Sequence, residues 1–437
     1  MLVARMPHAY PHDLAALSAT RLGDLRGGDP RFPVPGLRAL EELLSTAYQA
    51  TLLREEERPV TFRLLLAEPE AFPAGHGPPA GLHRLVFTAP RPFTEHELRR
   101  LSPAVKYHRA LIGIRPVGEG FEIWGMLQSG PQWLQGALGG RAAHLDVTDA
   151  AIVVSASGPG RLAVARGSTS LGEMRGGSLT PASMDVFESR WLRARFVDVR
   201  NELGALHAAA QARASGPWAS LDPDVTRTIS QQMIKRLVAL MRSTHHGGTL
   251  IVLPPECAGL VCDEGRYLRP KYSFVDDEPR RRYRSLMLDV MGALGELGGR
   301  LGRVVGWEAY EGSRTPVFAA LDEAIFEVSH LIAGLADVDG AVVITKRFEL
   351  LGFGAEIVGD LPDVPYVQRA LDVEGSKRVP ESIDGVGTRH RSAYRLCQQL
   401  HEALTVVVSQ DGNVRFAAWH DGAVTYWDHV PTGPLDT

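Results

Sequence analysis

Short apolar runs separated by glycine-rich turns occupy the middle of the first half of the chain. Such runs predict strands of an antiparallel sheet that are joined by hairpins. The four runs are Leu111–Ile114, Phe121–Gly125, Ala151–Val154 and Leu162–Ala165. Apolar helical patches and proline-rich turns come before them. We therefore expect residues 1–215 to form an α+β domain.

A longer hydrophobic period marks the second half of the chain. Apolar residues between Val225 and Leu240 recur every three or four positions, as on one face of an amphipathic helix. The buried-looking strand Thr249–Leu253 follows, and further helices are expected at residues 279–297 and 316–336. Strands that alternate with helices predict an α/β domain over residues 220–437.

The composition of residues 205–218 is typical of a junction between these two domains. The segment is rich in Ala, Ser and Gly and ends in Gly216-Pro217-Trp218. The chain has 437 residues, of which 44% are hydrophobic and 22% charged, so it is long enough for two or three globular domains. We expect a smaller α+β domain followed by the α/β domain.

The net charge and the hydropathy of the chain argue against nucleic acid and membranes as partners. The net charge of −4, from 47 basic and 51 acidic residues, provides no field that would attract nucleic acid. Neither a signal peptide nor a run of about 18 apolar residues is present, so we expect a cytoplasmic protein with no membrane segment. Cysteines 257, 262 and 397 are few and odd in number, which favours reduced thiols over disulfides and over a zinc site.

Four Asp-Gly pairs occur in the second half of the chain, and such pairs usually form tight turns. We expect turns or loops at Asp384, Asp411 and Asp421. Asp339 differs because it lies between a long apolar helical stretch and the buried-looking strand Ala341–Ile344. Its carboxylate would project from a strand edge, where it could hold a divalent ion. Gly340 would let a ligand approach the backbone closely.

A basic cluster, Gly387-Thr388-Arg389-His390-Arg391, precedes a helical pattern over residues 392–403. Free backbone N–H groups and the helix dipole at such a position favour an anion, and the side chains add donors for several phosphate oxygens. The alternative is a solvated helix start, which is the commoner role of an isolated Arg-His-Arg. For the similar run Arg280–Arg284 we favour the solvated helix start.

The order of these segments resembles the diadenylate cyclase domain, the catalytic unit of bacterial proteins that condense two ATP molecules into cyclic di-AMP. The resemblance covers roughly the last 200 residues. The N-terminal half is similar to sensor modules that are attached to some bacterial members of this family. The matching segments are Gly247–Val252, Asp339-Gly340-Ala341, Gly387–Arg391 and Val406–Ser409.

The resemblance implies a mixed sheet wrapped by helices, with one ATP per protomer and catalysis at the interface of a homodimer or higher homo-oligomer. It implies a catalytic role for Asp339, Gly340 and Ala341. It also implies that Mg²⁺ or Mn²⁺ is held by Asp339, with Asp411 as a second candidate. The phosphate-binding residues implied are Gly387, Thr388, Arg389, His390 and Arg391.

Two departures from the family pattern leave an alternative function open. Val338 stands where many members have His before the Asp-Gly-Ala motif. The later hairpin, Ser409-Gln410-Asp411-Gly412, is shorter than the usual Ser-Glu-Glu-Thr-Gly and lacks its glutamates. The alternative is a catalytically weak or silent nucleotide-binding sensor of the same fold. A third reading is an unrelated α/β protein in which these motifs are a turn and a helix start.

Overall fold

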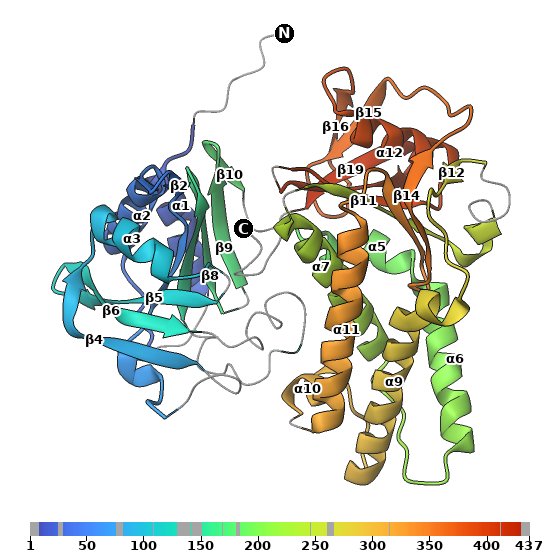
Figure 1. The fold of residues 1–437 in the computed structure, drawn as a ribbon, viewed down its shortest axis with the longest axis horizontal. Coiled ribbons are helices and arrows are strands. Elements are labelled where there is room, and N and C mark those ends of the chain that lie inside the picture. Colours follow the sequence, from blue (N-terminus) through green and yellow to red (C-terminus); the bar gives the residue numbers. More distant parts are fainter. Residues whose placement is uncertain are drawn as a thin grey trace. The chain divides into compact units, whose positions relative to one another are not determined.

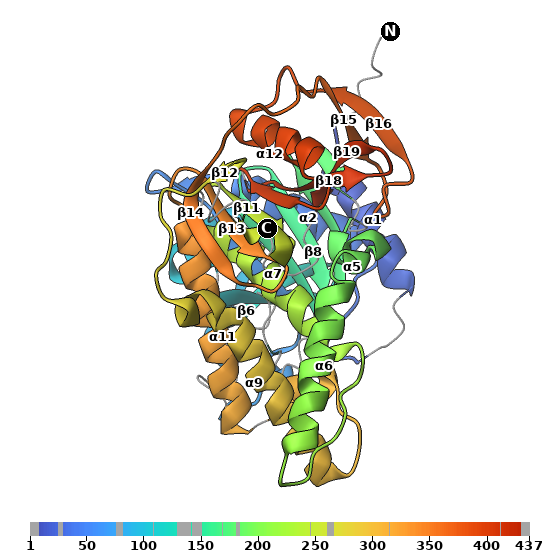
Figure 2. The same ribbon diagram turned by 90° about the vertical axis from the view of Figure 1, so that its right-hand side faces the viewer.

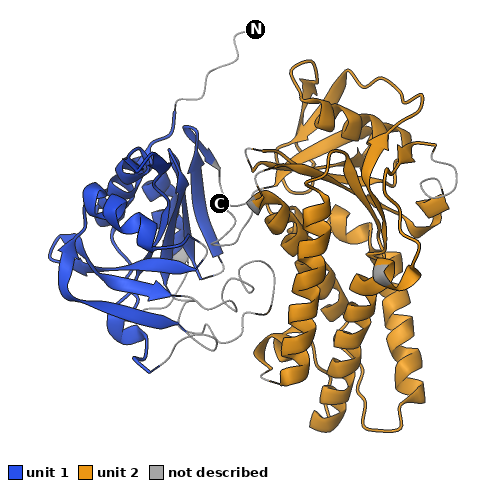
Figure 3. Cartoon of the chain, in the orientation of Figure 1, with its two compact units in different colours: residues 1–138, 142–182, 431–437 blue, residues 139–141, 183–430 orange. Residues whose placement is uncertain are grey.

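The structure is a computed structural model, and the chain in it divides into two compact units, which are coloured separately in Figure 3. Unit 1 contains residues 1–138, 142–182 and 431–437, and unit 2 contains residues 139–141 and 183–430. The residues described are 8–24, 29–75, 82–107, 109–128, 141, 151–167, 169–180, 184–244, 246–259, 266–313, 315–410 and 412–429.

Unit 1 is built on an eight-stranded sheet in the order β10-β9-β8-β7-β3-β5-β6-β4. Strands β3 and β5 run parallel, and the other neighbouring pairs are antiparallel. The four predicted strands are confirmed as parts of β5 to β8. The bounds are β1 Arg54–Glu55, β2 Arg58–Pro59, β3 Phe62–Leu66, β4 His83–Pro92, β5 Ala110–Val117, β6 Gly120–Gln128, β7 Ile152–Gly158, β8 Arg161–Arg166, β9 Thr169–Arg175 and β10 Ser178–Thr180.

Apolar side chains cover both faces of this sheet. On one face Leu64 packs with Leu14 and Leu44 from two of the helices. On the other face Leu65 packs with Trp124, whose Nε1 donates to the carbonyl oxygen of Ala67 at 2.8 Å. Because β3 is central and covered on both sides, all five of its residues are buried. The helices are α1 Pro11–Asp24, α2 Leu37–Thr51 and α3 Glu95–Leu101, with short 3₁₀ turns η1 Pro69–Ala71 and η2 Ser102–Ala104.

Unit 2 contains a nine-stranded mixed sheet in the order β12-β14-β13-β11-β17-β18-β19-β15-β16. The β11–β13 and β15–β19 pairs are parallel, and the others are antiparallel. The predicted α/β class, with a smaller α+β unit before it, is confirmed. The bounds are β11 Gly248–Leu253, β12 Leu268–Arg269, β13 Ala341–Thr345, β14 Leu350–Ile357, β15 Tyr366–Ala370, β16 Arg378–Ser382, β17 Leu404–Val408, β18 Val414–His420 and β19 Ala423–His429.

Helices lie on both faces of the unit 2 sheet (Figure 1). Helix α12 packs on one face through Leu396 and Cys397, which belong to apolar clusters with β11, β13 and β18 residues. Figure 2 shows α6, α9 and α11 extending from the opposite side of the sheet. The bounds are η3 Val186–Glu188, α5 Arg190–Ala194, α6 Val197–Arg213, α7 Val225–Ser243, η4 Pro255–Cys257, α9 Asp277–Leu301, α10 Trp307–Gly312, α11 Pro316–Leu335 and α12 Thr388–Gln399.

The predicted domain boundary near residues 215–220 is wrong, because the units divide between residues 182 and 183. Trp191 stacks on Trp427 of β19 with 4.1 Å between ring centroids. Gly299 of α9 lies so close to Pro217 that a Cβ built on it would overlap the Pro217 backbone. The segment at residues 205–218 therefore belongs to unit 2 and does not link the two units.

Candidate functional site

Strand pairing brings the two predicted motifs to the same end of the unit 2 sheet. Ala341 begins β13 and lies opposite Thr249 in the parallel β11. Val408 ends β17 and lies opposite Gly248 on the other side of β11. Neighbouring strands are about 4.8 Å apart, so β13 and β17 are separated by about 10 Å at this end. We call this end of the sheet the candidate site.

Asp339 lies in the bend between α11 and β13, as predicted. Its side chain is exposed, and it forms no ion pair with any residue that the structure describes. The carboxylate is therefore available to an ion or ligand. Asp411, the second candidate for the metal, lies outside the described residues.

Packing within unit 2 explains why residues 340 and 341 are small. Gly340 has φ +118°, and a Cβ built on it would lie 2.8 Å from the Cα of Gly354 in β14. The close approach expected there is made by the backbone of β14. Ala341 is 3% exposed and belongs to the apolar cluster under α12, so its side chain faces the core. Of the three residues, Asp339 alone presents a side chain at this edge.

The basic cluster forms the N-terminus of α12. Gly387 is the residue before the helix, which starts at Thr388 and not near residue 392 as predicted. Thr388, Arg389 and Arg391 are exposed. The first backbone N–H groups of a helix have no partner within it, and the helix dipole adds partial positive charge. The predicted position of the cluster at a helix N-terminus is confirmed.

The glycine pair Gly247-Gly248 links the two motifs. A Cβ built on Gly247 would lie 3.0 Å from Nη1 of Arg389 and 2.8 Å from the carbonyl oxygen of Val408. A Cβ built on Gly248 would lie 2.9 Å from the carbonyl oxygen of Ala336, which follows the last residue of α11. The start of β11 thus contacts the arginine on one side and the chain leading to Asp339 on the other.

His390 is not a third cation of the cluster. Burial, followed by the positive charge of Arg415, lowers the pKa of His390 to about 4. The ring is therefore neutral near pH 7 and can donate one hydrogen bond, whereas Arg389 and Arg391 keep their charge. The basic cluster predicted from the sequence therefore contains two charged arginines and a neutral histidine.

Arg415 and Asp428 form an ion pair beside His390 that sequence reasoning missed. They face each other across the β18–β19 hairpin, with 2.7 Å between Nε of Arg415 and Oδ1 of Asp428. The Arg415 guanidinium also lies 4.5 Å from the ring centroid of Tyr426. The Asp421-Gly422 turn sets this register, because the residues on either side of it, His420 and Ala423, pair with each other. Counting five residues back from His420 and five forward from Ala423 matches Arg415 with Asp428.

An aromatic stack beside Asp339 was also missed. The rings of Tyr272 and Phe353 lie 4.7 Å apart between centroids with an interplanar angle of 19°, and Tyr272 is 52% exposed. A Cβ built on Gly354 would lie 3.5 Å from Cδ2 of Tyr272 and 3.6 Å from the carbonyl oxygen of Asp339. An exposed aromatic face of this kind suits a nucleobase.

The other sequence candidates have structural roles. Arg280 and Arg281 pair with Asp277 at the start of α9, which agrees with a solvated helix start for this part of the run. Tyr283 is buried and Arg284 pairs with Glu202, so the end of the run packs into unit 2. Cys257 is half-buried and Cys397 is buried, both as free thiols, while Cys262 lies outside the described residues. Within the described part of the chain, no three His, Cys, Asp or Glu side chains are grouped as metal ligands.

Comparison with known proteins bears on unit 1. Residues 29–128 match the family model of the probable sensor domain DACNV, which confirms that the N-terminal part contains a sensor-type module. No curated protein matches the chain. A solved structure described as a hypothetical membrane spanning protein from Bacillus cereus is 14% identical, covers 55% of this chain and 94% of its own, and has a TM-score of 0.24. A score this low supports no inference about the fold or the function.

Among the helices in the described ranges, none combines the length and the apolar character needed to span a membrane.

Proposed function

We propose that unit 2 binds ATP at the candidate site and joins two ATP molecules into cyclic di-AMP, with release of pyrophosphate. The observation that carries this proposal is the position of Gly247-Gly248 between Arg389 and Ala336, which lies three residues before Asp339. It supports placing a carboxylate and a basic helix N-terminus around one ligand. Carboxylate, arginines and helix N-terminus together suit a metal-bound triphosphate.

The phosphates would be held by Arg389, Arg391 and the hydroxyl of Thr388, all of which are exposed at the start of α12. Arginine suits this role because its planar donors match phosphate oxygens in pairs. Neutral His390 would donate one further hydrogen bond. The base would stack on Tyr272, on the other side of the Asp339 bend.

The divalent cation fits the residues that are present. Mg²⁺ is commonly bound through one or two carboxylates together with substrate phosphates, and the exposed Asp339 can supply the first. When bound, Mg²⁺ or Mn²⁺ would neutralise phosphate charge and favour departure of pyrophosphate. Asp339 would also orient the triphosphate toward the attacking hydroxyl.

The reaction needs two nucleotides that face each other. The 3′-oxygen of each ATP forms a bond to the α-phosphorus of the other, the bond to pyrophosphate breaks, and the hydroxyl proton is released. One candidate site holds one ATP, so ring closure requires a second copy of the chain. A homodimer or higher homo-oligomer is therefore part of the proposal, and the sensor-type module of unit 1 would control it.

A nucleotide-binding sensor without turnover is the second candidate. It is favoured by Val338, which is 38% exposed beside Asp339 where many cyclases have His, so a potential metal ligand is missing. Among the described residues of the Asp339-Gly340-Ala341 motif, Asp339 alone offers a carboxylate to the metal. Both candidates use the same phosphate-binding residues and differ in whether product forms.

The deciding experiment is chromatography of products after the purified chain is incubated with ATP and Mg²⁺ or Mn²⁺. Asp339→Asn is compared with Asp337→Asn, which alters an exposed carboxylate two residues away. We expect cyclic di-AMP from the parent and the Asp337 variant but not from Asp339→Asn. Binding of ATP or cyclic di-AMP without product in the parent would establish the silent sensor. Absence of binding to either nucleotide would exclude both candidates.

A further inference from the structure

An ion pair of the unit 2 sheet lies beside the basic cluster but is not part of it. Arg415 of β18 and Asp428 of β19 are paired residues of one hairpin, and Nε of Arg415 is 2.7 Å from Oδ1 of Asp428. Their side chains are 28% and 46% exposed. An ion pair this open to water contributes little to stability. Stability therefore does not explain why a charge stands at this position.

Aromatic rings fix the position of the Arg415 guanidinium. Its central carbon lies 4.5 Å from the ring centroid of Tyr426. The hydroxyl of Tyr426 donates to Glu381 of β16, and its ring stacks on Tyr394 of α12 with 5.9 Å between centroids and 24° between planes. Both tyrosines are at most 1% exposed. The guanidinium is therefore held between its partner carboxylate and a buried pair of rings.

This pair of rings leads to His390 of the basic cluster. His390 lies one helical turn before Tyr394, and their ring centroids are 6.3 Å apart. Burial is the first cause of the low pKa of His390, and the positive charge of Arg415 is the second. Asp428 raises this pKa and Arg389 lowers it, each by less than Arg415 does. The strongest charge acting on the histidine thus comes from the sheet and not from its own helix.

The protonation state of the His390 ring decides what it offers to a phosphate. A neutral imidazole has one N–H donor and one acceptor nitrogen, whereas an imidazolium has two donors and a charge. The charge of Arg415 favours the neutral form, and the stack of Tyr426 and Tyr394 connects the guanidinium to the ring. Both the protonation state and the orientation of His390 therefore depend on Arg415.

We propose that Arg415 is a positioning residue of the candidate site, which orients the His390 ring toward the triphosphate while the arginines of the basic cluster bind it. Arg415 acts through His390 and through the rings of Tyr426 and Tyr394, without touching the nucleotide. This inference rests on the proposed nucleotide function. It adds to the site a residue that lies outside both motifs, on the strand hairpin beneath α12.

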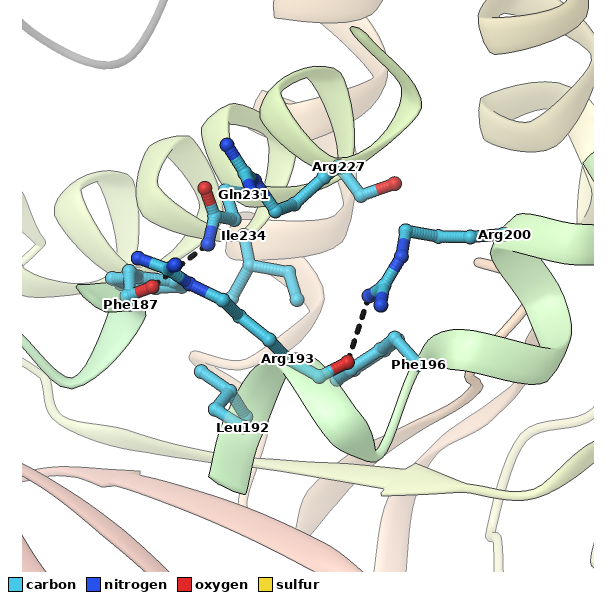
Figure 4. Close-up of a pocket in the computed structure, with 9 residues that line it drawn as sticks. Phe187, Leu192, Arg193, Phe196, Arg200, Arg227, Gln231 and Ile234 are labelled. Atoms are coloured by element: carbon cyan, nitrogen blue, oxygen red, sulfur yellow. Dashed lines mark hydrogen bonds between the residues drawn. The ribbon is translucent and has the colours of Figure 1, made fainter. Parts of the chain in front are cut away.

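Arg227 of α7 provides a matched control, because its surroundings resemble those of Arg415. Its side chain is 30% exposed and pairs with the exposed Asp224 at 2.9 Å. It is one of the residues that line a small opening between η3, α5, α6 and α7 (Figure 4). Helix α7 ends at Ser243, so about 24 Å of helix separates Arg227 from the end that leads to Gly247. Arg227→Met therefore removes a similar ion pair away from the candidate site.

The test combines calorimetric titration of the full-length chain with ATP and NMR titration of His390, whose signal is identified by its loss in His390→Gln. In Arg415→Met we expect the Kd for ATP near pH 7 to rise about two- to tenfold, the effect of one neutral hydrogen bond. The pKa of His390 should rise from about 4 toward its ordinary value of 6.5. Arg415→Lys keeps the charge and should keep the pKa low. Arg227→Met should match the parent in both measurements.

The results separate this inference from the proposed function. If the parent binds ATP and Arg415→Met binds it equally well, the inference is wrong and the proposed function stands. An unchanged pKa of His390 in Arg415→Met, with far-UV circular dichroism showing that the variant folds, also overturns the inference, because weaker binding would then not act through the histidine. If the parent binds no ATP, the proposed function is wrong and no site remains for Arg415 to position.

Discussion

Arg389 donates a hydrogen bond from Nη1 to the carbonyl oxygen of His246 at 3.4 Å, across 143 positions of sequence. The contact is geometrically weak, since it lies near the outer limit for a hydrogen bond. It therefore leaves the guanidinium free to turn toward a stronger acceptor such as a phosphate oxygen. The carbonyl belongs to the residue before the glycine pair, so the arginine rests against the chain that borders the candidate site.

Replacing Gly247 by Ala should damage the candidate site. The new methyl group would press on Arg389 and on the Val408 carbonyl, and the residue would have to keep φ +68°. We expect a loss of about 1–3 kcal/mol in the free energy of unfolding, together with weaker ATP binding. Urea unfolding and calorimetry measure the two effects. Gly385→Ala is the control, because a Cβ there would meet nothing within 4 Å; equal behaviour of the two variants would contradict the prediction.

Removing the Arg391 guanidinium should weaken ATP binding with little change in stability. The side chain is exposed, so folding gains little from it, whereas a charge-assisted bond to phosphate is worth about 1.5–3 kcal/mol. We expect the Kd of Arg391→Ala for ATP to rise by about tenfold or more. Arg300→Ala, in the exposed last turn of α9, is the control. Unchanged ATP affinity in Arg391→Ala would remove the phosphate role of the cluster.

Shortening Tyr272 to Ala should affect the base and not the phosphates. Stacking of a base on an aromatic ring is worth about 1–3 kcal/mol, so we expect ATP affinity to fall by about fivefold or more. Affinity for inorganic triphosphate should stay the same, because the arginines are untouched. Tyr366→Ala, 65% exposed in β15, is the control. Equal loss for ATP and triphosphate would show that the substitution acts through the fold.

Unit 2 should lose stability in acid through His429. Burial, which outweighs the effect of Asp185, lowers the pKa of His429 to about 4, below the ordinary value of 6.5. The unfolded chain therefore binds the proton more tightly, and stability falls as pH drops from about 6.5 toward 4. We expect His429 to account for about 2 kcal/mol of the loss between pH 7 and pH 5. Urea unfolding of His429→Gln at both pH values should show a smaller loss; the same loss as in the parent would contradict this.

The parts of the fold that local pattern controls could be predicted from the sequence. Helix α11 was expected at residues 316–336 and spans Pro316–Leu335, because its apolar stripe is long and Pro316 marks its first turn. The start of α12 was placed four residues late, because Arg and His at its first positions carry no apolar period. The domain boundary failed for a related reason: composition does not show that Gly299 and Pro217 pack together.

Some residues of the candidate site could likewise be predicted from the sequence, and others could not. Asp339 and the basic cluster were found because each lies beside a strand or helix with a clear pattern. Tyr272 was missed because it follows a polar loop, and its partner Phe353 lies on a distant segment that β12–β14 pairing brings beside it. The low pKa of His390 depends on Arg415, which the hairpin brings close. Sequence therefore indicated the residue types, whereas their protonation and neighbours depended on sheet pairing.

Strand β11 cannot complete its ladder until residues 341–345 and 404–408 have arrived on its two sides. These strands are separated by long stretches of chain, and bringing them together costs entropy before their pairing stabilises the sheet. Unit 2 is therefore expected to fold slowly. During synthesis the N-terminal sheet of unit 1 can form while the later strands are still being made. The end of the sheet that carries Asp339 and Arg389 is thus completed only after residues 404–408 have been synthesised.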